Sequence, residues 1–260
     1  MNLSAGKPKH FQDAGKAALK ALKKLHETGS YKPKDLLKIK EYRDLINATS
    51  DIFTSAITHE VPEEMKQHLE NDAFVFSGLK THAQLTEARS LLKDGSGNIR
   101  PYEDFERSIL KLNEQYNTHY LEAEYEFAVQ SSQSAAQWAN LQDDTSRYWL
   151  EYRTAGDERV RASHAALNGI CLPADDSFWL EYYLPNGWRC RCVAVEILAR
   201  DGKLSDSNKA KKLGEAATSQ ISPEGKNKLA MFRFNPGAEK KIFPPKNAYS
   251  KVVGANELKL

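Results

Sequence analysis

The 260-residue sequence has no long hydrophobic run and no recognisable export signal. No apolar stretch approaches the roughly 20 residues that a membrane-spanning helix needs. The first ten residues, MNLSAGKPKH, place no apolar stretch after their charges, so we expect no secretory signal. Hydrophobic residues still make up 40% of the sequence and aromatic residues 10%, which is enough to bury a sizeable core and argues against general disorder.

Cysteine is scarce: Cys171, Cys190 and Cys192 are the only three, and they lie within 22 residues. An odd number excludes a fully paired disulfide framework within one chain. Without an export signal, free thiols or a metal site are expected rather than disulfides.

Net charge is also nearly absent, at +2, which argues against a surface that coats nucleic acid over its whole extent. The total conceals a pattern. Residues 1–50 carry a net charge of +6, residues 51–150 carry −9, residues 151–200 carry −1 and residues 201–260 carry +6. The basic ends are therefore candidate contact regions for DNA or for an acidic protein surface.

Helical periodicity dominates the first part of the chain. It predicts an amphipathic helix over 13–26, a second helix from Pro33 to Ile46, and a further helix start at Pro62. The lysine-rich face of the first helix is most simply solvated, with an acidic protein surface and nucleic acid as alternatives. The run 73–79 is predicted as a strand or a buried turn, and Thr81 as the cap of the next helix.

A long helix is predicted over residues 102–141, which contain no internal Pro or Gly. About 40 residues would span roughly 60 Å, so we expect either a kink near residues 131–134 or a projecting stalk. Its predicted polar face holds much of the negative charge of the middle segment, namely Glu103, Asp104, Glu106, Glu114, Glu122, Glu124 and Glu126.

The pattern changes after Asp144. Residues 148–154 and 190–198 read as two strands that could pair, with a short helix at 158–167 between them. The fold class predicted is α+β: a mostly helical N-terminal part with a long helix, then a small α+β core with antiparallel strands and an extended C-terminal arm. The predicted domains are 1–100 (helical region), 101–200 (long helix plus core) and 201–260 (basic extended arm).

A specific motif lies between Tyr152 and Cys192. Its positions, in order, are Thr154, Asp157, Arg161, His164, Leu167, Gly169, Asn186, Gly187, Trp188, Cys190, Arg191 and Cys192. This segment resembles the Mu F-like family of phage head morphogenesis proteins, also called minor head proteins. Residues 116–125 and 76–81 are similar to family segments upstream, and 232–237 resembles the tail of Bacteroides-type members, so the resemblance covers about residues 73–245. Two departures stand out: Leu184-Pro185 replaces a common Pro-Pro pair, and Cys171 is not expected from the motif.

The resemblance implies a non-enzymatic minor head protein of a phage or prophage that acts in head (procapsid) morphogenesis. Its expected partners are the portal protein and the head or scaffold proteins. DNA contact through the basic termini, and a part in handling or delivering packaged DNA, are further expectations. The expected location is the virion head, with the host cytoplasm during assembly. No catalytic residues are expected. The motif core is predicted to consist of Thr154, Asp157, Arg161, His164, Gly169, Gly187, Trp188 and Arg191.

Four residues form a candidate zinc site: His164, Cys171, Cys190 and Cys192. Thiolates and an imidazole are suitable donors for zinc, and Cys-x-Cys on an extended segment places both thiols on one face. The alternative is that the cysteines are small buried apolar residues and that His164 hydrogen-bonds a carboxylate such as Asp157.

Other interpretations remain for the same segment. A Cys190 or Cys192 nucleophile with His164 as base would make a metal- or thiol-dependent enzyme or toxin-like effector on the same core. Asp175 and Asp176 could act as catalytic carboxylates, although a turn with an Asp cap is favoured. The arginines and acids around the motif are expected to pair locally, and its aromatic residues to form core in a strand-like context. A plain nucleic-acid-binding module is disfavoured by the acidic middle segment.

Overall fold

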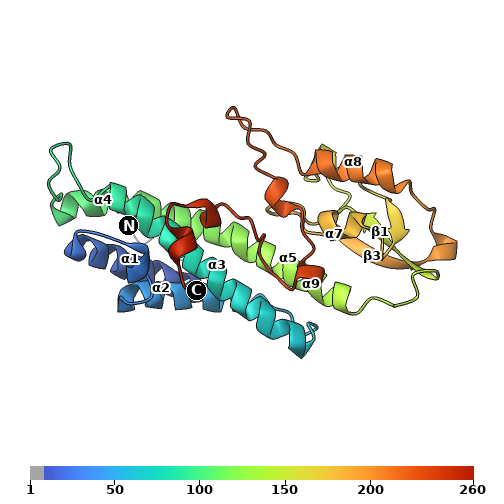
Figure 1. The fold of residues 1–260 in the computed structure, drawn as a ribbon, viewed down its shortest axis with the longest axis horizontal. Coiled ribbons are helices and arrows are strands. Elements are labelled where there is room, and N and C mark those ends of the chain that lie inside the picture. Colours follow the sequence, from blue (N-terminus) through green and yellow to red (C-terminus); the bar gives the residue numbers. More distant parts are fainter. Residues whose placement is uncertain (1–8) are drawn as a thin grey trace. The chain divides into compact units, whose positions relative to one another are not determined.

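The chain divides into two compact units, both drawn in Figure 1. The structure is a computed structural model that describes residues 9–260. The helical unit comprises the described residues up to Ser55 together with Glu70–Tyr125 and Lys246–Leu260, and the sheet unit comprises Ala56–Leu69 and Glu126–Pro245. These units differ from the three predicted domains, because two long helices each contribute to both units and the last residues return to the helical one.

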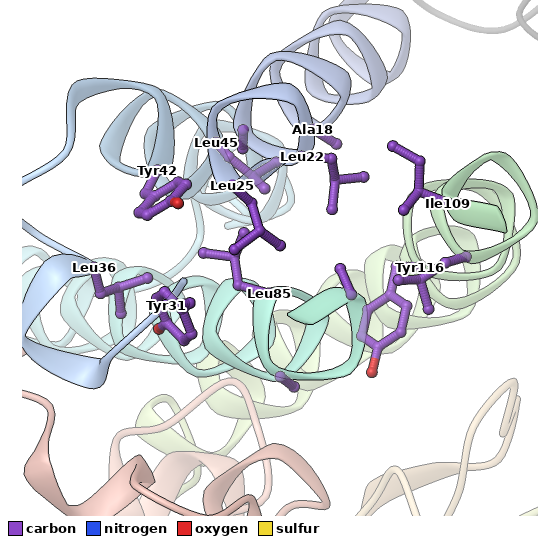
Figure 2. Close-up of a cluster of buried hydrophobic side chains, with 14 of the residues drawn as sticks. Ala18, Leu22, Leu25, Tyr31, Leu36, Tyr42, Leu45, Leu85, Ile109 and Tyr116 are labelled. Atoms are coloured by element: carbon purple, nitrogen blue, oxygen red, sulfur yellow. The ribbon is translucent and has the colours of Figure 1, made fainter. Parts of the chain in front are cut away.

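Amphipathic helices build the helical unit. They are α1 (Lys9–Thr28), α2 (Lys40–Thr54), most of α3 (Glu63–Ser90), α4 (Tyr102–Glu114) and the start of α5 (Leu121–Ala139), with 3-10 turns at Pro33–Asp35, Tyr249–Lys251 and Ala255–Glu257. The helix predicted at 13–26 is confirmed, whereas Pro33 opens only a short turn before α2. Figure 2 shows the resulting core, in which Leu22 and Leu25 of α1 lie near Leu85 and Ile109.

Helix α3 occupies the segment predicted as a strand or turn at 73–79, so that prediction is wrong. Pro62 precedes its first turn, as expected, and accepts the Met65 N–H at 2.9 Å. Residues 80–85 are all buried, including Thr81, which lies inside the helix rather than at a cap. A helix buried on several sides has no clear apolar stripe, which is why its periodicity is weak in the sequence.

A buried ion pair joins Lys80 of α3 to Glu124 of α5. The Lys80 Nζ lies 2.5 Å from Glu124 Oε2, and the two side chains are 2% and 4% exposed. Tyr249 donates its hydroxyl to Glu124 Oε1 at 2.5 Å, and the ammonium lies 5.7 Å from the ring centres of both Tyr116 and Tyr249. Glu124 therefore does not belong to the exposed polar face predicted for the long helix.

The segment predicted as one long helix runs as α4, a π-helical segment at Gln115–Tyr120, and α5. Residues 131–134, the alternative site of a kink, lie within the continuous α5, and the departure from α-helical hydrogen bonding is at Gln115–Tyr120 instead. Ser132 is buried, and its hydroxyl accepts the Thr58 N–H at 2.8 Å. Leu121 and Phe127 on the same segment are also buried, so it is not an exposed stalk.

Three antiparallel strands in the order β2-β1-β3 define the sheet unit, which confirms the α+β class. They are β1 (Tyr148–Arg153), β2 (Cys171–Pro173) and β3 (Val193–Leu198). β1 pairs with β3 from Tyr148 opposite Leu198 to Arg153 opposite Val193, so the predicted pairing is confirmed. β3 begins at Val193 rather than at Cys190, and β2 is an addition to the prediction.

Short helices complete the sheet unit, and in Figure 1 α7 and α8 lie near β1 and β3. The helices are α6 (Ala162–Ala165), α7 (Phe178–Tyr182), α8 (Ser207–Ala217) and α9 (Pro236–Glu239), with 3-10 turns at Ala199–Asp201 and Ala230–Phe232. The aromatic residues Phe178, Trp179 and Tyr183 are buried with Leu150 and Tyr152 of β1. Their role as core is confirmed, but they lie on and beside a helix rather than on a strand.

The last 60 residues differ from the predicted extended arm. Asp206 caps α8 by accepting the Lys209 N–H at 2.8 Å. Farther on, Phe232, Phe234 and Phe243 are at most 1% exposed. These aromatic residues are spaced irregularly between Pro and Gly, so the sequence shows no period although the segment is packed. Among the described helices, none is both long and apolar enough to cross a membrane.

Candidate functional site

The motif residues lie on two connections of the sheet unit: the β1–β2 connection (residues 154–170) and the α7–β3 connection (residues 183–192). Thr154 donates its N–H and its hydroxyl to Asn168 Oδ1, at 2.9 and 3.1 Å. Gly169 has a φ of +80°, which disfavours other residues, and donates its N–H to the Tyr152 carbonyl at 2.8 Å. Thr154 and Gly169 thus close the first connection onto itself.

Asp157 and Arg191 join the two connections. The guanidinium donates through Nη1 to Oδ2 at 2.7 Å and through Nη2 to Oδ1 at 2.5 Å, which is bidentate geometry. Arg159 adds a contact at 3.2 Å to the same carboxylate. The hydrogen bonds from Arg191, and then those from Arg159, hold the pKa of Asp157 well below its usual range.

A second contact anchors the α7–β3 connection. Arg161 donates through Nη2 to the Trp188 carbonyl at 2.6 Å. The Trp188 ring meets Phe127 and Phe232 edge-on, with ring centres 5.0 and 5.2 Å apart. The carbonyl of Gly187 accepts the Cys190 N–H at 3.2 Å. These contacts hold the backbone in place just before the two cysteines, and they are made by the motif residues Arg161, Gly187 and Trp188.

The Cys190-Arg191-Cys192 segment alternates between two environments. Cys190 and Cys192 are buried, whereas Arg191 between them reaches Asp157. Because successive side chains of an extended segment point to opposite sides, the ion pair on one side places both thiols on the other. His164 of α6 meets them there: its Nδ1 lies 3.6 Å from Cys190 Sγ and 3.8 Å from Cys192 Sγ.

These three side chains form a compact donor group. All three are buried, and their donor atoms lie within 4.8 Å of one another. The hydrogen bond from Cys192 and the contact with His164 lower the pKa of Cys190. The hydrogen bond to Cys190, together with burial, raises the pKa of Cys192.

Tyr152 and Asn186 border the donor group. The Tyr152 hydroxyl donates to Asn186 Oδ1 at 3.1 Å. Burial raises the pKa of Tyr152, and the charge of Cys190 and Cys192 raises it further, so the phenol stays protonated. On the other side of the His164 ring, Nε2 is buried and has no hydrogen-bond partner among the described residues.

Cys171 lies apart from this group, so the predicted set of four ligands is wrong. It lies on β2 opposite Glu151 of β1, and its N–H donates to Ser205 Oγ at 3.0 Å. The strand order explains the separation, because β1 lies between β2 and β3, the strand that Cys190 and Cys192 precede. Cys171 carries a thiol that could bind zinc, but it lies on β2, at the edge of the sheet opposite to β3.

Two of the carboxylates, Asp157 and Asp176, have structural partners. The alternative pairing of His164 with Asp157 is not formed, since the arginines hold Asp157 and the imidazole faces the thiols. Asp176 Oδ1 accepts the Phe178 N–H at 2.8 Å and the Ser207 hydroxyl at 3.0 Å. The segment is a turn, as predicted, but the N-cap position of α7 is Ser177, and Asp176 accepts the Phe178 N–H from the residue before it.

A small pocket opens beside the donor group. Its lining consists of Ala155, Arg159, Val160, Arg161, His164, Arg189, Cys190, Arg191 and Cys192. Local pairing of the arginines, as predicted, is confirmed for Arg159 and Arg191, which bind Asp157, whereas Arg189 lies 3.5 Å from the distant Glu126. Four of the nine lining residues are arginines, and Arg161 among them donates to a carbonyl rather than to a carboxylate.

Residues 88–195 match the family described as Phage Mu protein F like protein. The matched region begins in the last turn of α3, ends within β3, and includes the whole donor group. The similarity to the Mu F-like family therefore holds for this part of the chain. The expected extent of 73–245 reaches beyond the matched residues at both ends. The Bacteroides-type comparison at 232–237 lies outside them and stays a prediction.

Two relatives share part of this region. The chain is 39% identical over 95 residues to the Mu-like prophage FluMu F protein of Haemophilus influenzae. The aligned residues are 34% of this chain and 22% of that protein. It is 36% identical over 70 residues to protein F of Escherichia phage Mu, to which a role in capsid assembly is provisionally assigned; this covers 26% of the chain and 16% of that protein. The matches therefore span about a fifth of the relatives' length. No solved structure matches the chain.

Two residues at the site were not singled out from the sequence. Asn168 closes the β1–β2 connection, and Tyr152 borders the thiols. A signal exists for Tyr152, because strand alternation places it on the same face as the buried Leu150. Asn168 directly precedes the positive-φ Gly169, in a position where a short side chain can accept backbone hydrogen bonds.

Proposed function

We propose that this protein acts in the assembly of a phage head. The observation that carries the proposal is the match of residues 88–195 to the Mu F-like family, together with the capsid-assembly role assigned to the phage Mu relative. The second relative is named for a prophage, and the same setting is proposed here. The motif supports this role as a rigid structural core, since its charged residues bind one another.

The finer role we propose is that of a minor component that joins the head through the portal or through scaffold proteins. A basic surface on α1 supports it, because Lys16, Lys20 and Lys23 are exposed there. Residues 201–260 add a net charge of +6. Acidic groups on a partner would complement these surfaces. The protein would assemble in the host cytoplasm and remain in the virion head.

Contact with packaged DNA is proposed through the same basic ends. Residues 1–8, which belong to the basic N-terminal segment, lie outside the described residues. If lysine–phosphate contacts dominate, binding should weaken steeply between about 50 and 200 mM salt. A filter-binding assay over that range tests this, and binding that does not respond to salt would contradict it.

Removal of the gene from the prophage tests the proposed function. After induction, we expect fewer infectious particles, and wild-type protein supplied in trans should restore them. Electron microscopy of the lysate then separates two stages: missing or misshapen heads indicate assembly, whereas normal heads with poor infectivity indicate DNA delivery. An unchanged yield of infectious particles from the deletion would contradict a role in the head.

One observation favours a second candidate function. His164 beside two cysteines is a donor set that a metal- or thiol-dependent enzyme or toxin-like effector could use. Expression in a host without the prophage distinguishes the two. A toxin-like effector would inhibit growth as wild type but not as Cys190→Ala, whereas a head protein should be tolerated equally in both forms.

A further inference from the structure

We propose that His164, Cys190 and Cys192 bind one zinc ion and leave a fourth coordination position open to an anionic ligand. This proposal goes beyond head assembly and does not depend on it. All three donors are buried in the sheet unit and come from two segments of the chain, α6 and the α7–β3 connection.

The distances between donors fit a tetrahedral site. With Zn–S bonds of about 2.3 Å and a Zn–N bond of about 2.1 Å, tetrahedral angles place nitrogen and sulfur about 3.6 Å apart. The His164 Nδ1 lies 3.6 Å from Cys190 Sγ and 3.8 Å from Cys192 Sγ. The two sulfurs lie within 4.8 Å of each other, which permits the sulfur–sulfur edge of about 3.8 Å that the same bonds require.

Hydrogen bonding alone does not explain both contacts of His164. A single imidazole nitrogen carries either one proton or one lone pair, so it makes a good hydrogen bond to one thiol at a time. Here Nδ1 is nearly equidistant from two sulfurs. One cation bound by all three atoms accounts for this arrangement.

The donor types select the metal. Thiolates with an imidazole favour zinc over magnesium or calcium, which prefer oxygen ligands. Two thiolates also neutralise a divalent cation, so the buried site carries no net charge before a fourth ligand binds.

The surrounding structure holds the donors in place before any metal binds. The Asp157–Arg191 pair fixes the alternation that turns both thiols inward. Arg161 holds Trp188, two positions before Cys190, through the Trp188 carbonyl. Such outer contacts orient metal ligands and raise their affinity. A bound zinc would therefore cross-link α6 to the segment that leads into β3.

The fourth position faces a basic environment. The pocket beside the donors is lined by Arg159, Arg161, Arg189 and Arg191. Arg159, Arg189 and Arg191 each contact a carboxylate. Arg161 instead donates to the Trp188 carbonyl, so no carboxylate among residues 9–260 is seen to neutralise its charge. Its positive charge favours an anion, such as hydroxide, over neutral water at the open position.

Cobalt substitution tests the proposal on the full-length protein. Metal-free, reduced protein is titrated with Co²⁺ and then with Zn²⁺. We expect one equivalent of Co²⁺ to produce thiolate charge-transfer absorption and strong visible bands of a tetrahedral complex, and Zn²⁺ to abolish both. Added azide should shift the visible bands if the fourth position is open. Visible bands that azide leaves unchanged would overturn the open position.

Matched variants identify the ligands. Cys190→Ser, Cys192→Ser and His164→Ala should each weaken binding by more than the ~10–100-fold that loss of an outer partner costs. Cys171→Ser is the control, because Cys171 is also buried but lies on β2, and it should bind like wild type. Circular dichroism of each metal-free variant establishes that it is folded. A folded Cys190→Ser variant that binds zinc as tightly as wild type would overturn the site, and so would reduced wild-type protein that binds no metal.

Discussion

The carboxylate of Asp157 accepts two hydrogen bonds from the guanidinium of Arg191, at 2.7 and 2.5 Å. The two residues are 34 positions apart and lie on different connections of the sheet unit. Arg191 is flanked on both sides by the cysteines that face His164. The positions of Cys190 and Cys192 therefore depend on the Asp157–Arg191 ion pair, although neither of these two residues is a donor.

Replacement of Asp157 by Asn should loosen this arrangement. We expect Tm to fall by about 2–4 °C, as for a modest loss of stability in a chain of this size. Scanning calorimetry measures the change. Asp175→Asn is the control, because Asp175 is exposed on the neighbouring turn and should leave Tm unchanged. Equal Tm values for both variants would contradict the role assigned to the pair.

The same substitution should alter the pH dependence of stability. The folded pKa of Asp157 is below its value in the unfolded chain, so the folded state binds fewer protons. The contribution of Asp157 is then fully present above about pH 4 and is lost as pH falls further. The Tm difference between wild type and Asp157→Asn should be constant near neutral pH and should shrink in acid. A difference that grows in acid would contradict this account.

The buried pair Lys80–Glu124 should be intolerant of single truncation. Lys80→Met leaves a buried carboxylate without its cation, which costs about 3–5 kcal/mol. Adding Glu124→Leu should recover much of that loss in urea denaturation. The control is the exposed pair of Lys40 and Asp44, where Lys40→Met should cost less than about 1 kcal/mol. Similar losses at Lys80 and Lys40 would show that burial of the pair does not matter.

His82 should make the helical unit sensitive to mild acid. Burial lowers the pKa of His82, and the neutral ring fits its two partners: Nδ1 accepts the Tyr31 hydroxyl at 2.7 Å, and Nε2 donates to the Val253 carbonyl at 3.0 Å. Because the folded pKa is below the unfolded one, stability is lost as pH falls below about 6.5. Nearby Glu257 opposes this shift without reversing it.

A pair of histidine variants checks this prediction. His82→Gln should flatten the fall in the urea midpoint between about pH 7.5 and 5.5, the range in which histidine titrates. His119→Gln should keep the wild-type profile, because His119 is exposed. If the urea midpoint of both variants falls with pH as steeply as that of the wild type, His82 is not the cause of the acid sensitivity.

Two glycines should respond to alanine in opposite directions. At Gly214 of α8 an added Cβ would lie 2.6–2.8 Å from the Tyr182 ring, so Gly214→Ala should destabilise the protein despite the better helix propensity of alanine. At Gly15 of α1 nothing lies within 4 Å, and Gly15→Ala should stabilise by about 0.5–1 kcal/mol. Thermal denaturation measures both, and a stabilised Gly214→Ala variant would contradict the close packing of α7 and α8.

The sequence predicts those parts of the fold that depend on local pattern. The amphipathic α1, the start of α3 after Pro62 and the antiparallel pairing of β1 with β3 follow from periodicity and turn residues. The alternation in Cys190-Arg191-Cys192 likewise predicts that both thiols share a face, and the structure confirms it.

What the sequence does not predict depends on contacts between distant residues. Cys171 has the same chemistry as the other cysteines, and only the strand order removes it from the site. Lys80 and Glu124 are 44 positions apart and lie on different helices. Nothing in the sequence around Glu124 therefore distinguishes it from a solvent-exposed acid. Phe232, Phe234 and Phe243 have no period in the sequence, and all three are buried against the ring of Phe127, more than 100 positions away.

The protein composition of purified heads tests the central claim most directly. Heads from the induced prophage, separated on a gradient and analysed by quantitative mass spectrometry, should contain this chain at a low copy number relative to the major capsid protein. The portal protein should be present in the same fractions. Absence of the chain from both procapsids and mature heads would contradict the account.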